Sequence, residues 1–316
     1  MEIEIDRRTL LLGSAVLAAA APCSARASAP LKMETLPLWP SRPPGGEHVT
    51  VEQRAIRRSP NSPASDIATY GVTRPTLTII RPQRPNGTSM LLVPGGSYER
   101  VAMEADGGAI AHFIAERGFT VGALLYRLPY DGWTAGPDAP LQDAQRALRL
   151  LARDAGVGAR VGTIGFSAGG HLAGMLATRF EERTYEPVDA ADSLAARPSF
   201  AGLFFPVVTM DRPYAHEQSR RNLLGKQPAA ARIHRWSLEQ HVRKDMPPTF
   251  VSAATDDKVV PVENSLMLFS AMRRVGAPGS LHIFDVGGHG FGELTDRSGP
   301  GRFWPQLFED WLSRQP

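Results

Sequence analysis

The chain carries the stretch VGTIGFSAGG at residues 161–170, and this stretch decides the fold. Its first part, Val161 to Gly165, is an apolar run typical of a buried strand, and His171 to Phe180 has the pattern of a helix. Ser167 stands between them with glycines on both sides. A nucleophile on a sharp strand-to-helix turn needs small neighbours, because its backbone is strained and adjacent atoms crowd it. A serine that only capped the helix would not need these glycines, so we interpret Ser167 as a catalytic nucleophile.

Strands and helices alternate on both sides of this stretch. The patterns predict strands at Thr76–Ile80, Met90–Val93, Phe119–Tyr126, Val161–Gly165, Phe200–Val208, Phe250–Ala254 and Leu281–Val286, and helices at Ala109–Arg117, Leu141–Arg153, His171–Phe180, Val262–Val275 and Trp304–Ser313. Such alternation implies right-handed crossovers and a mostly parallel sheet that is covered on both faces. The predicted fold class is therefore α/β, with one doubly wound sheet flanked by helices.

The rest of the chain is divided around this sheet. Residues 76–316 form the predicted catalytic domain, and residues 28–75 form a proline-rich lead-in with at most an edge strand or two. Residues 211–247 are polar and arginine-rich and interrupt the alternation. We predict that they form a small cap-like insertion over the carboxyl edge of the sheet, where open α/β sheets bind ligands.

A serine nucleophile needs a base, usually a histidine that a carboxylate orients. His289 follows the last predicted strand within the sequence Gly-Gly-His-Gly, where a loop can place an imidazole over the sheet edge. His171 lies on the helix after the turn, and we expect it to make a structural hydrogen bond. Asp256 and Asp257 follow the strand before, in the chain order that the carboxylate requires. Adjacent residues point to opposite sides of an extended chain, so only one of the two can face the imidazole.

Acyl transfer also needs hydrogen-bond donors at the developing oxyanion. The sequence Pro-Gly-Gly-Ser-Tyr at residues 94–98 follows a predicted strand, and its glycines allow backbone N–H groups to approach a substrate closely. We predict that Gly96 or Ser97 forms the oxyanion hole together with the amide of Ala168. The alternative is an ordinary glycine turn.

The first residues have the layout of an export signal. Arg7 and Arg8 precede a run of small or apolar residues from Leu10 to Ala21, and a small-residue cleavage site follows at Ala27. The paired arginines resemble a twin-arginine signal. The run is too short for a stable membrane span, and it is apolar on every face, unlike an amphipathic helix. We therefore expect residues 1–27 to be removed and the protein to be periplasmic or secreted; Cys23 as a lipid anchor is a minor alternative.

Composition narrows the classes of partner. The 316 residues include 35 Lys and Arg against 32 Asp and Glu, and the formal charge of +3 is spread along the chain. This disfavours a nucleic-acid binder. One cysteine cannot form an internal disulfide, and the eight histidines are scattered, so we predict neither a metal nor another cofactor. The composition therefore leaves a small molecule or an oligosaccharide as the expected partner, and the motifs decide its chemistry.

These motifs resemble those of the α/β-hydrolase superfamily. The chain looks most like exported esterases related to acetyl xylan and feruloyl esterases, which are loosely grouped with prolyl-oligopeptidase-like hydrolases. The motifs that carry the resemblance are Leu36–Pro40, Val93–Tyr98, Tyr126–Leu128, Gly165–Gly170, Ser219–Gly225, Asp256–Ser265 and Gly287–Gly290. The resemblance implies a Ser167–His289–Asp257 triad, with Asp256 as the second choice, and acetyl or hydroxycinnamoyl esters of plant cell-wall polysaccharide as substrates.

Two positions depart from the family pattern, and other functions remain open. Ser97 stands where a third glycine is common, and Ala253 stands where a histidine often precedes the acid. A small serine peptidase and a feruloyl esterase are the alternative enzymes, and an exported binding protein without activity is the alternative from another class. Trp133, Trp236 and Trp304 could stack on sugar rings, although packing is the simpler role.

Overall fold

The computed structural model describes residues 30–316, except for residues 65, 105, 157 and 292–298. The predicted export signal of residues 1–27, with its cleavage site at Ala27, lies outside the described residues. In the part of the chain that is described, no helix combines the length and the apolar character needed to cross a membrane.

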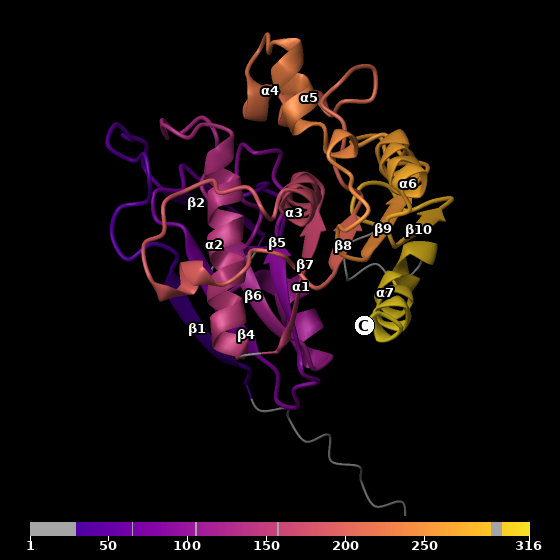
Figure 1. Ribbon diagram of the computed structural model, residues 1–316, viewed down its shortest axis with the longest axis horizontal. Helices are drawn as coiled ribbons and strands as arrows, with labels where there is room; N and C mark the ends of the chain where they lie inside the picture. Colours follow the sequence, from indigo (N-terminus) through magenta and orange to yellow (C-terminus); the bar gives the residue numbers. More distant parts are fainter. Residues whose placement is uncertain (1–29, 65, 105, 157, 292–298) are drawn as a thin grey trace, which may run out of the picture. The chain divides into compact units, whose positions relative to one another are not determined.

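A central sheet of eight strands organises the chain (Figure 1). Its strands are β1 (Lys32–Pro37), β4 (Thr76–Arg81), β6 (Thr120–Leu125), β5 (Thr88–Val93), β7 (Arg160–Phe166), β8 (Ala201–Phe204), β9 (Thr249–Ala254) and β10 (Gly279–Phe284), in this spatial order. Pairing is parallel from β6 to β10 and antiparallel where β4 pairs with β6 and with β1. The predicted mostly parallel sheet is therefore confirmed.

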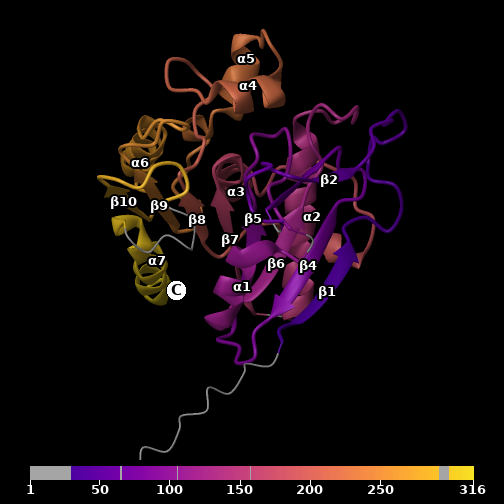
Figure 2. The same cartoon turned by 180° about the vertical axis from the view of Figure 1, so that it is seen from behind.

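Helices cover both faces of this sheet, as the two views show (Figures 1 and 2). One face carries α2 (Asp138–Ala155), α3 (Ala168–Thr178) and α6 (Glu263–Val275), and the other carries α1 (Gly108–Glu116) and α7 (Trp304–Ser313). Phe113 of α1 and Trp304 of α7 meet with ring centroids 6.1 Å apart. Because both faces are covered, the five inner residues of β7 are all buried, which explains why its sequence is a continuous apolar run.

Strand β1 of the lead-in pairs with β4 and forms one edge of the sheet. A separate two-stranded ribbon pairs β2 (Arg54–Arg57) with β3 (Ile67–Tyr70), whereas residues 49–51, an apolar alternation, form no strand. The insertion at 211–247 contains two short helices, α4 (Glu217–Leu224) and α5 (Ala230–Trp236). It joins the body of the protein through hydrogen bonds such as Leu238 N to Val208 O, 2.9 Å.

Most predicted elements are present within a few residues of their expected bounds, and one strand is shorter. We expected a strand over Phe200–Val208, but β8 ends at Phe204. Phe205 has a φ of 37°, and Pro206 lacks an N–H group for a strand ladder. The backbone then passes the strand-to-helix turn after β7, called the elbow below, where Val207 N donates to Ser167 O at 3.1 Å. The residues after β8 therefore leave the strand and support the predicted nucleophile.

Candidate active site

Ser167 occupies a sharp turn between β7 and α3. Its φ of 56° and ψ of −122° lie outside the helical and extended regions, and its side chain makes no capping hydrogen bond to the helix. A Cβ at Gly165 would lie 2.4 Å from Gly169 O, and a Cβ at Gly169 would lie 2.2 Å from Val93 O. Glycine is therefore required at both positions, because a side chain would collide with these backbone oxygens, as the sequence pattern predicts.

His289 lies between Ser167 and Asp257. Its Nε2 is 3.0 Å from Ser167 Oγ, and its Nδ1 is 2.8 Å from Asp257 Oδ2. An ionised carboxylate can only accept, so Nδ1 carries the proton and Nε2 is left to accept from the serine hydroxyl. The structure thus brings together the three residues that the sequence singled out.

The two adjacent aspartates have different partners. Asp257 is buried, and its second oxygen accepts from Val259 N at 2.8 Å and from Val260 N at 2.9 Å. Asp256 is exposed and accepts from Gly288 N at 2.7 Å, and this backbone donor lowers the pKa of Asp256. Asp257 therefore contacts the imidazole, while Asp256 fastens the loop that carries it.

The turn at residues 94–98, which we call the oxyanion turn, packs directly against this serine. A Cβ at Gly95 would lie 3.2 Å from Ser167 Cβ. Gly96 has a φ of 134°, and a Cβ there would lie 2.0 Å from Arg100 O, so the tight turn requires glycine. Ser97 follows with a φ of 57°. No hydrogen bond joins the N–H groups of Gly96, Ser97 or Ala168 to another residue in the described part of the chain, so these donors are available to a ligand.

Two buried hydrogen bonds of His171 connect the oxyanion turn to α3 and to the insertion. Tyr98 Oη lies 2.7 Å from His171 Nδ1, and His171 Nε2 lies 2.8 Å from the carbonyl oxygen of Trp236. His171 therefore makes the structural hydrogen bonds expected of it. Burial lowers the pKa of His171 to about 4, which keeps the ring neutral. Trp236 is buried, with its ring next to His171 and Arg179, so it packs against α3 rather than presenting a face to a sugar.

The insertion adds contacts that the sequence analysis missed. Asn222 of α4 donates its side-chain amide to Ser97 O at 2.9 Å. His216, just before α4, has its Nδ1 2.8 Å from Ser219 Oγ; burial and then the nearby His289 lower its pKa. Both residues lie in or beside the Ser219–Gly225 motif, so that motif was the available signal. No spacing rule connects it to a turn more than a hundred residues earlier.

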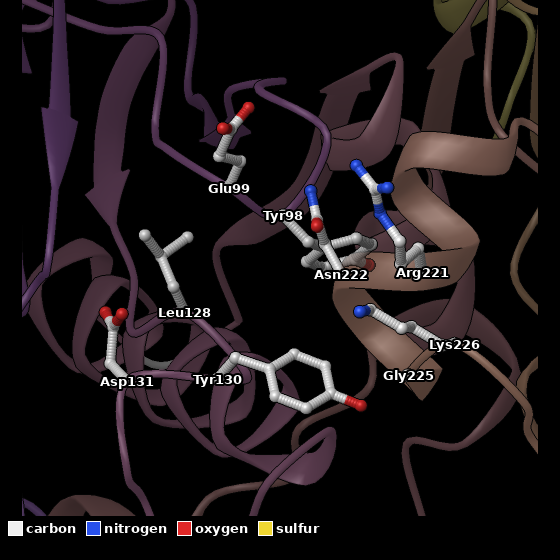
Figure 3. Close-up of a pocket in the computed structure, with 9 residues that line it drawn as sticks. All are labelled: Tyr98, Glu99, Leu128, Tyr130, Asp131, Arg221, Asn222, Gly225 and Lys226. Atoms are coloured by element: carbon white, nitrogen blue, oxygen red, sulfur yellow. The ribbon is translucent and has the colours of Figure 1, made fainter.

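A pocket of about 390 Å³ opens beside the oxyanion turn (Figure 3). Tyr98 and Glu99 of the turn line one part of it, and residues of the loop after β6, including Tyr130 and Asp131, line another. The remaining wall comes from α4 and its C-terminal end, residues 221–226. Among the described residues, no three His, Cys, Asp or Glu side chains are grouped so that they could hold a metal ion.

The fold and this site together define a protein of the α/β-hydrolase type. The chain belongs to the BD-FAE family, whose model matches residues 77–272. This confirms the resemblance that the motifs indicated.

Individual relatives agree with that assignment. The chain is 34% identical over 246 residues to an acetylxylan esterase of Xylanibacter ruminicola, covering 74% of this chain and 47% of that protein. It is 33% identical over 211 residues to endo-1,4-beta-xylanase B of Butyrivibrio fibrisolvens, covering 66% of this chain and 33% of that protein. The chain thus spans a third to a half of the length of these curated relatives.

A solved structure matches over a larger share. The acetyl ester-xyloside bifunctional hydrolase of Caldicellulosiruptor lactoaceticus superimposes with a TM-score of 0.68 at 30% identity, and the match covers 89% of this chain and 95% of that one.

Proposed function

We propose that the protein is a serine carboxylic-ester hydrolase that removes acyl groups, acetyl above all, from carbohydrate esters. The observation that carries this proposal is the continuous hydrogen-bonded series from Asp257 through His289 to Ser167, close to the oxyanion amides, which have no partner among the described residues. The relatives support the choice of ester, because one is named an acetylxylan esterase and another an acetyl ester-xyloside hydrolase.

The geometry gives each group a role in a two-step reaction. Ser167 Oγ attacks the ester carbonyl while its proton passes to His289 Nε2, and Asp257 stabilises the imidazolium through Nδ1–H. The carbonyl oxygen becomes an oxyanion that accepts from the amides of Ala168 and of Gly96 or Ser97. When this intermediate collapses, the sugar hydroxyl leaves with the proton from Nε2. Water then attacks the acyl-enzyme with His289 as base, and this step releases the carboxylic acid and restores the serine.

Rates of hydrolysis of different substrates distinguish the esterase proposal from its alternatives. We expect the wild-type protein to hydrolyse p-nitrophenyl acetate and acetylated xylo-oligosaccharides faster than methyl ferulate, and aminoacyl anilides very slowly. Ser167→Ala should reduce ester hydrolysis to near background. Ser193→Ala changes an exposed serine at the end of a short 3-10 helix and should not change ester hydrolysis. A wild-type protein that hydrolyses none of the esters would refute the esterase proposal, and faster anilide cleavage would favour a peptidase.

We also propose that the enzyme acts outside the cytoplasm, after export by the twin-arginine route. The support is the sequence pattern of residues 7–27 and the polymeric substrates that such esters imply. Fractionation of cells that express the full chain should place the mature protein in the periplasm or medium. The double variant Arg7→Lys, Arg8→Lys should retain the precursor in the cytoplasm, and unchanged export of this variant would exclude the twin-arginine route.

A further inference from the structure

The pocket beside the oxyanion turn is placed to hold a part of the substrate that lies beyond the reacting ester. Tyr98, which lines it, directly follows Ser97 in the turn. Asn222 also lines it and donates to Ser97 O. A ligand in this pocket therefore shares its walls with the predicted oxyanion hole. The volume of about 390 Å³ lies within the usual range for small-molecule sites and suits one or two sugar units.

An exposed aromatic ring forms one side of the pocket. Tyr130 is 57% exposed, which is unusual for a large aromatic side chain. Its hydroxyl reaches the C-terminal end of α4, where a Cβ at Gly225 would lie 2.7 Å from it. In Figure 3 the ring spans the floor between the loop after β6 and the insertion. An exposed ring whose hydroxyl end lies close to α4 offers an apolar face to a flat ligand such as a sugar.

Two cations lie on one wall of this space. Arg221 and Lys226, from α4 and the residues after it, line the pocket and are exposed. Within the described residues, neither takes part in an ion pair or a side-chain hydrogen bond. Arg212, by contrast, pairs with Glu217 at 2.6 Å at the start of the same helix. Unpaired cations in a pocket favour an anionic ligand, and an arginine binds a carboxylate with two parallel hydrogen bonds.

Two carboxylates, Glu99 and Asp131, also line the pocket. Glu99 pairs with Arg100 at 2.8 Å and accepts from Gln218 at 2.6 Å. Figure 3 shows Asp131 beside Leu128, across the pocket from Arg221 and Lys226. Burial raises the pKa of Asp131 to about 6, so part of its charge is lost at mildly acidic pH. Both carboxylates are suitable acceptors for the hydroxyl groups of a sugar ring.

We propose that this pocket is a subsite for a carboxylate-bearing sugar, a uronate unit of the oligosaccharide whose ester is cleaved. The ring lies on Tyr130, its carboxylate binds Arg221 and Lys226, and its hydroxyl groups face Glu99 and Asp131. This inference rests on the proposed esterase function and adds a preference among its substrates. A phosphate group would use the cations equally well, but it would not need the aromatic floor or the opposing acceptors.

The test compares two acetylated xylo-oligosaccharides of equal length, one neutral and one with a uronate side group. We expect the wild-type kcat/KM to be about tenfold higher for the acidic substrate, since one charge-assisted contact is worth about this factor. Arg221→Gln with Lys226→Gln should bring the ratio to about one, and added salt should weaken the wild-type preference. Arg232→Gln, an exposed cation on α5 outside the pocket lining, is the matched control and should keep the wild-type ratio.

A binding measurement separates failure of the subsite from failure of the esterase proposal. Calorimetry of the Ser167→Ala protein with a uronate-bearing xylo-oligosaccharide without acetyl groups reports the pocket alone, and p-nitrophenyl acetate reports the chemistry alone. Binding that weakens about tenfold in the double variant supports the subsite, whatever the activity. A wild-type ratio of one, or a ratio that the double variant leaves unchanged, overturns it. Competition by inorganic phosphate as strong as by glucuronate would also overturn it, because the pocket would then be a general anion site.

Discussion

At the scale of single residues, the site depends on backbone conformations that few side chains adopt. Ser167, Ser97 and Tyr98 all have φ near 57°, although none of them is glycine. Non-glycine residues in this region cost of order 1–3 kcal/mol each and persist only where the surroundings hold them. Here the surroundings are the close contact of Gly95 with the elbow and the hydrogen bond from Tyr98 to His171. The strained residues are therefore the nucleophile and two residues of the turn that carries predicted oxyanion amides.

The two aspartates after β9 should respond differently to the same substitution. Asp257→Asn removes the charge that stabilises the imidazolium and places an amide where only an acceptor fits His289 Nδ1–H, so we expect kcat to fall about 10³- to 10⁴-fold. Asp256→Asn keeps an oxygen that can accept from Gly288 N and should cost less than about tenfold. Steady-state hydrolysis of p-nitrophenyl acetate measures both. The reverse order of effects would move the acid assignment by one residue.

Asp131 should make the stability of the protein depend on pH. Burial raises its pKa from 3.8 to about 6, so between these values the folded state keeps a proton that the unfolded state releases. Rising pH therefore favours unfolding in this window, and the loss is complete above about pH 6. The Asp131→Asn variant has no charge at this position and should not lose stability in this way as pH rises. We expect the Tm of the variant minus that of the wild type to be small at pH 4 and to grow up to about pH 6.5.

The control for this prediction is Asp310→Asn, which removes an exposed carboxylate on α7. Its Tm difference from the wild type should stay flat over the same pH range. A Tm difference for Asp131→Asn that is also flat, or that shrinks as pH rises, contradicts the assignment of a raised pKa to Asp131.

Residue identities were the most predictable part of the site. Ser167, His289 and the Asp256–Asp257 pair follow strands in the required chain order, and chemistry limits each role to few residue types. The choice within the aspartate pair needed family resemblance, because the backbone path of the acid loop decides which side chain turns inward. The Ser219–Gly225 motif marked the region of Asn222 and His216, but their contacts could not be predicted, since nothing in the sequence says which loop the insertion covers.

At the scale of elements, α4 links the insertion to the catalytic loops. Its Asn222 donates to Ser97 O, and its Gln218 donates to Glu99 two residues further along the same turn. The insertion thus braces the oxyanion turn as well as forming a wall of the pocket. A polar cap that does both explains why residues 211–247 interrupt the alternation without breaking the sheet.

Asn222 should act as a positioning residue. Asn222→Ala removes the donor that holds Ser97 O, and the turn is then free to move the oxyanion amides out of line, so we expect kcat for p-nitrophenyl acetate to fall about tenfold. KM should change little, because this small ester has no sugar to reach the pocket. Gln218→Ala on the same helix is the control, with a small effect on kcat. A lower Tm with unchanged kcat would show a merely structural role.

Element boundaries were predicted well wherever the apolar pattern continued to the end of the element. The predicted bounds of α7 are those observed, and β9 begins one residue before its predicted start. Arg146 shows a limit of the pattern: it is a charged residue within the helix predicted at Leu141–Arg153, yet it is buried, with its charge paired to Asp189 and Asp192. A helical stripe locates the side that packs on the sheet, and it carries no information about a second layer that covers the opposite side.

At the scale of the whole molecule, a buried ion pair joins three regions that are distant in the sequence. Arg127, just after β6, and Asp143 of α2 are both fully buried, with Arg127 Nη2 2.9 Å from Asp143 Oδ1. The same carboxylate accepts from Trp39 Nε1 at 2.8 Å, and Arg127 Nη1 donates to Pro44 O at 2.8 Å. The lead-in is thereby fixed to the body of the protein well beyond its edge strand β1.

Breaking this pair should destabilise the protein strongly. Asp143→Asn leaves the charge of Arg127 in a fully buried position without its counter-charge, and we expect the free energy of unfolding to fall by about 3–5 kcal/mol. The double change Arg127→Met with Asp143→Leu leaves no buried charge and should cost less than the single change. Glu186→Gln, which breaks an exposed pair with Arg183, should cost below about 1 kcal/mol. Urea unfolding measures all three, and if Asp143→Asn costs no more than Glu186→Gln, the lead-in is held by β1 and apolar packing instead.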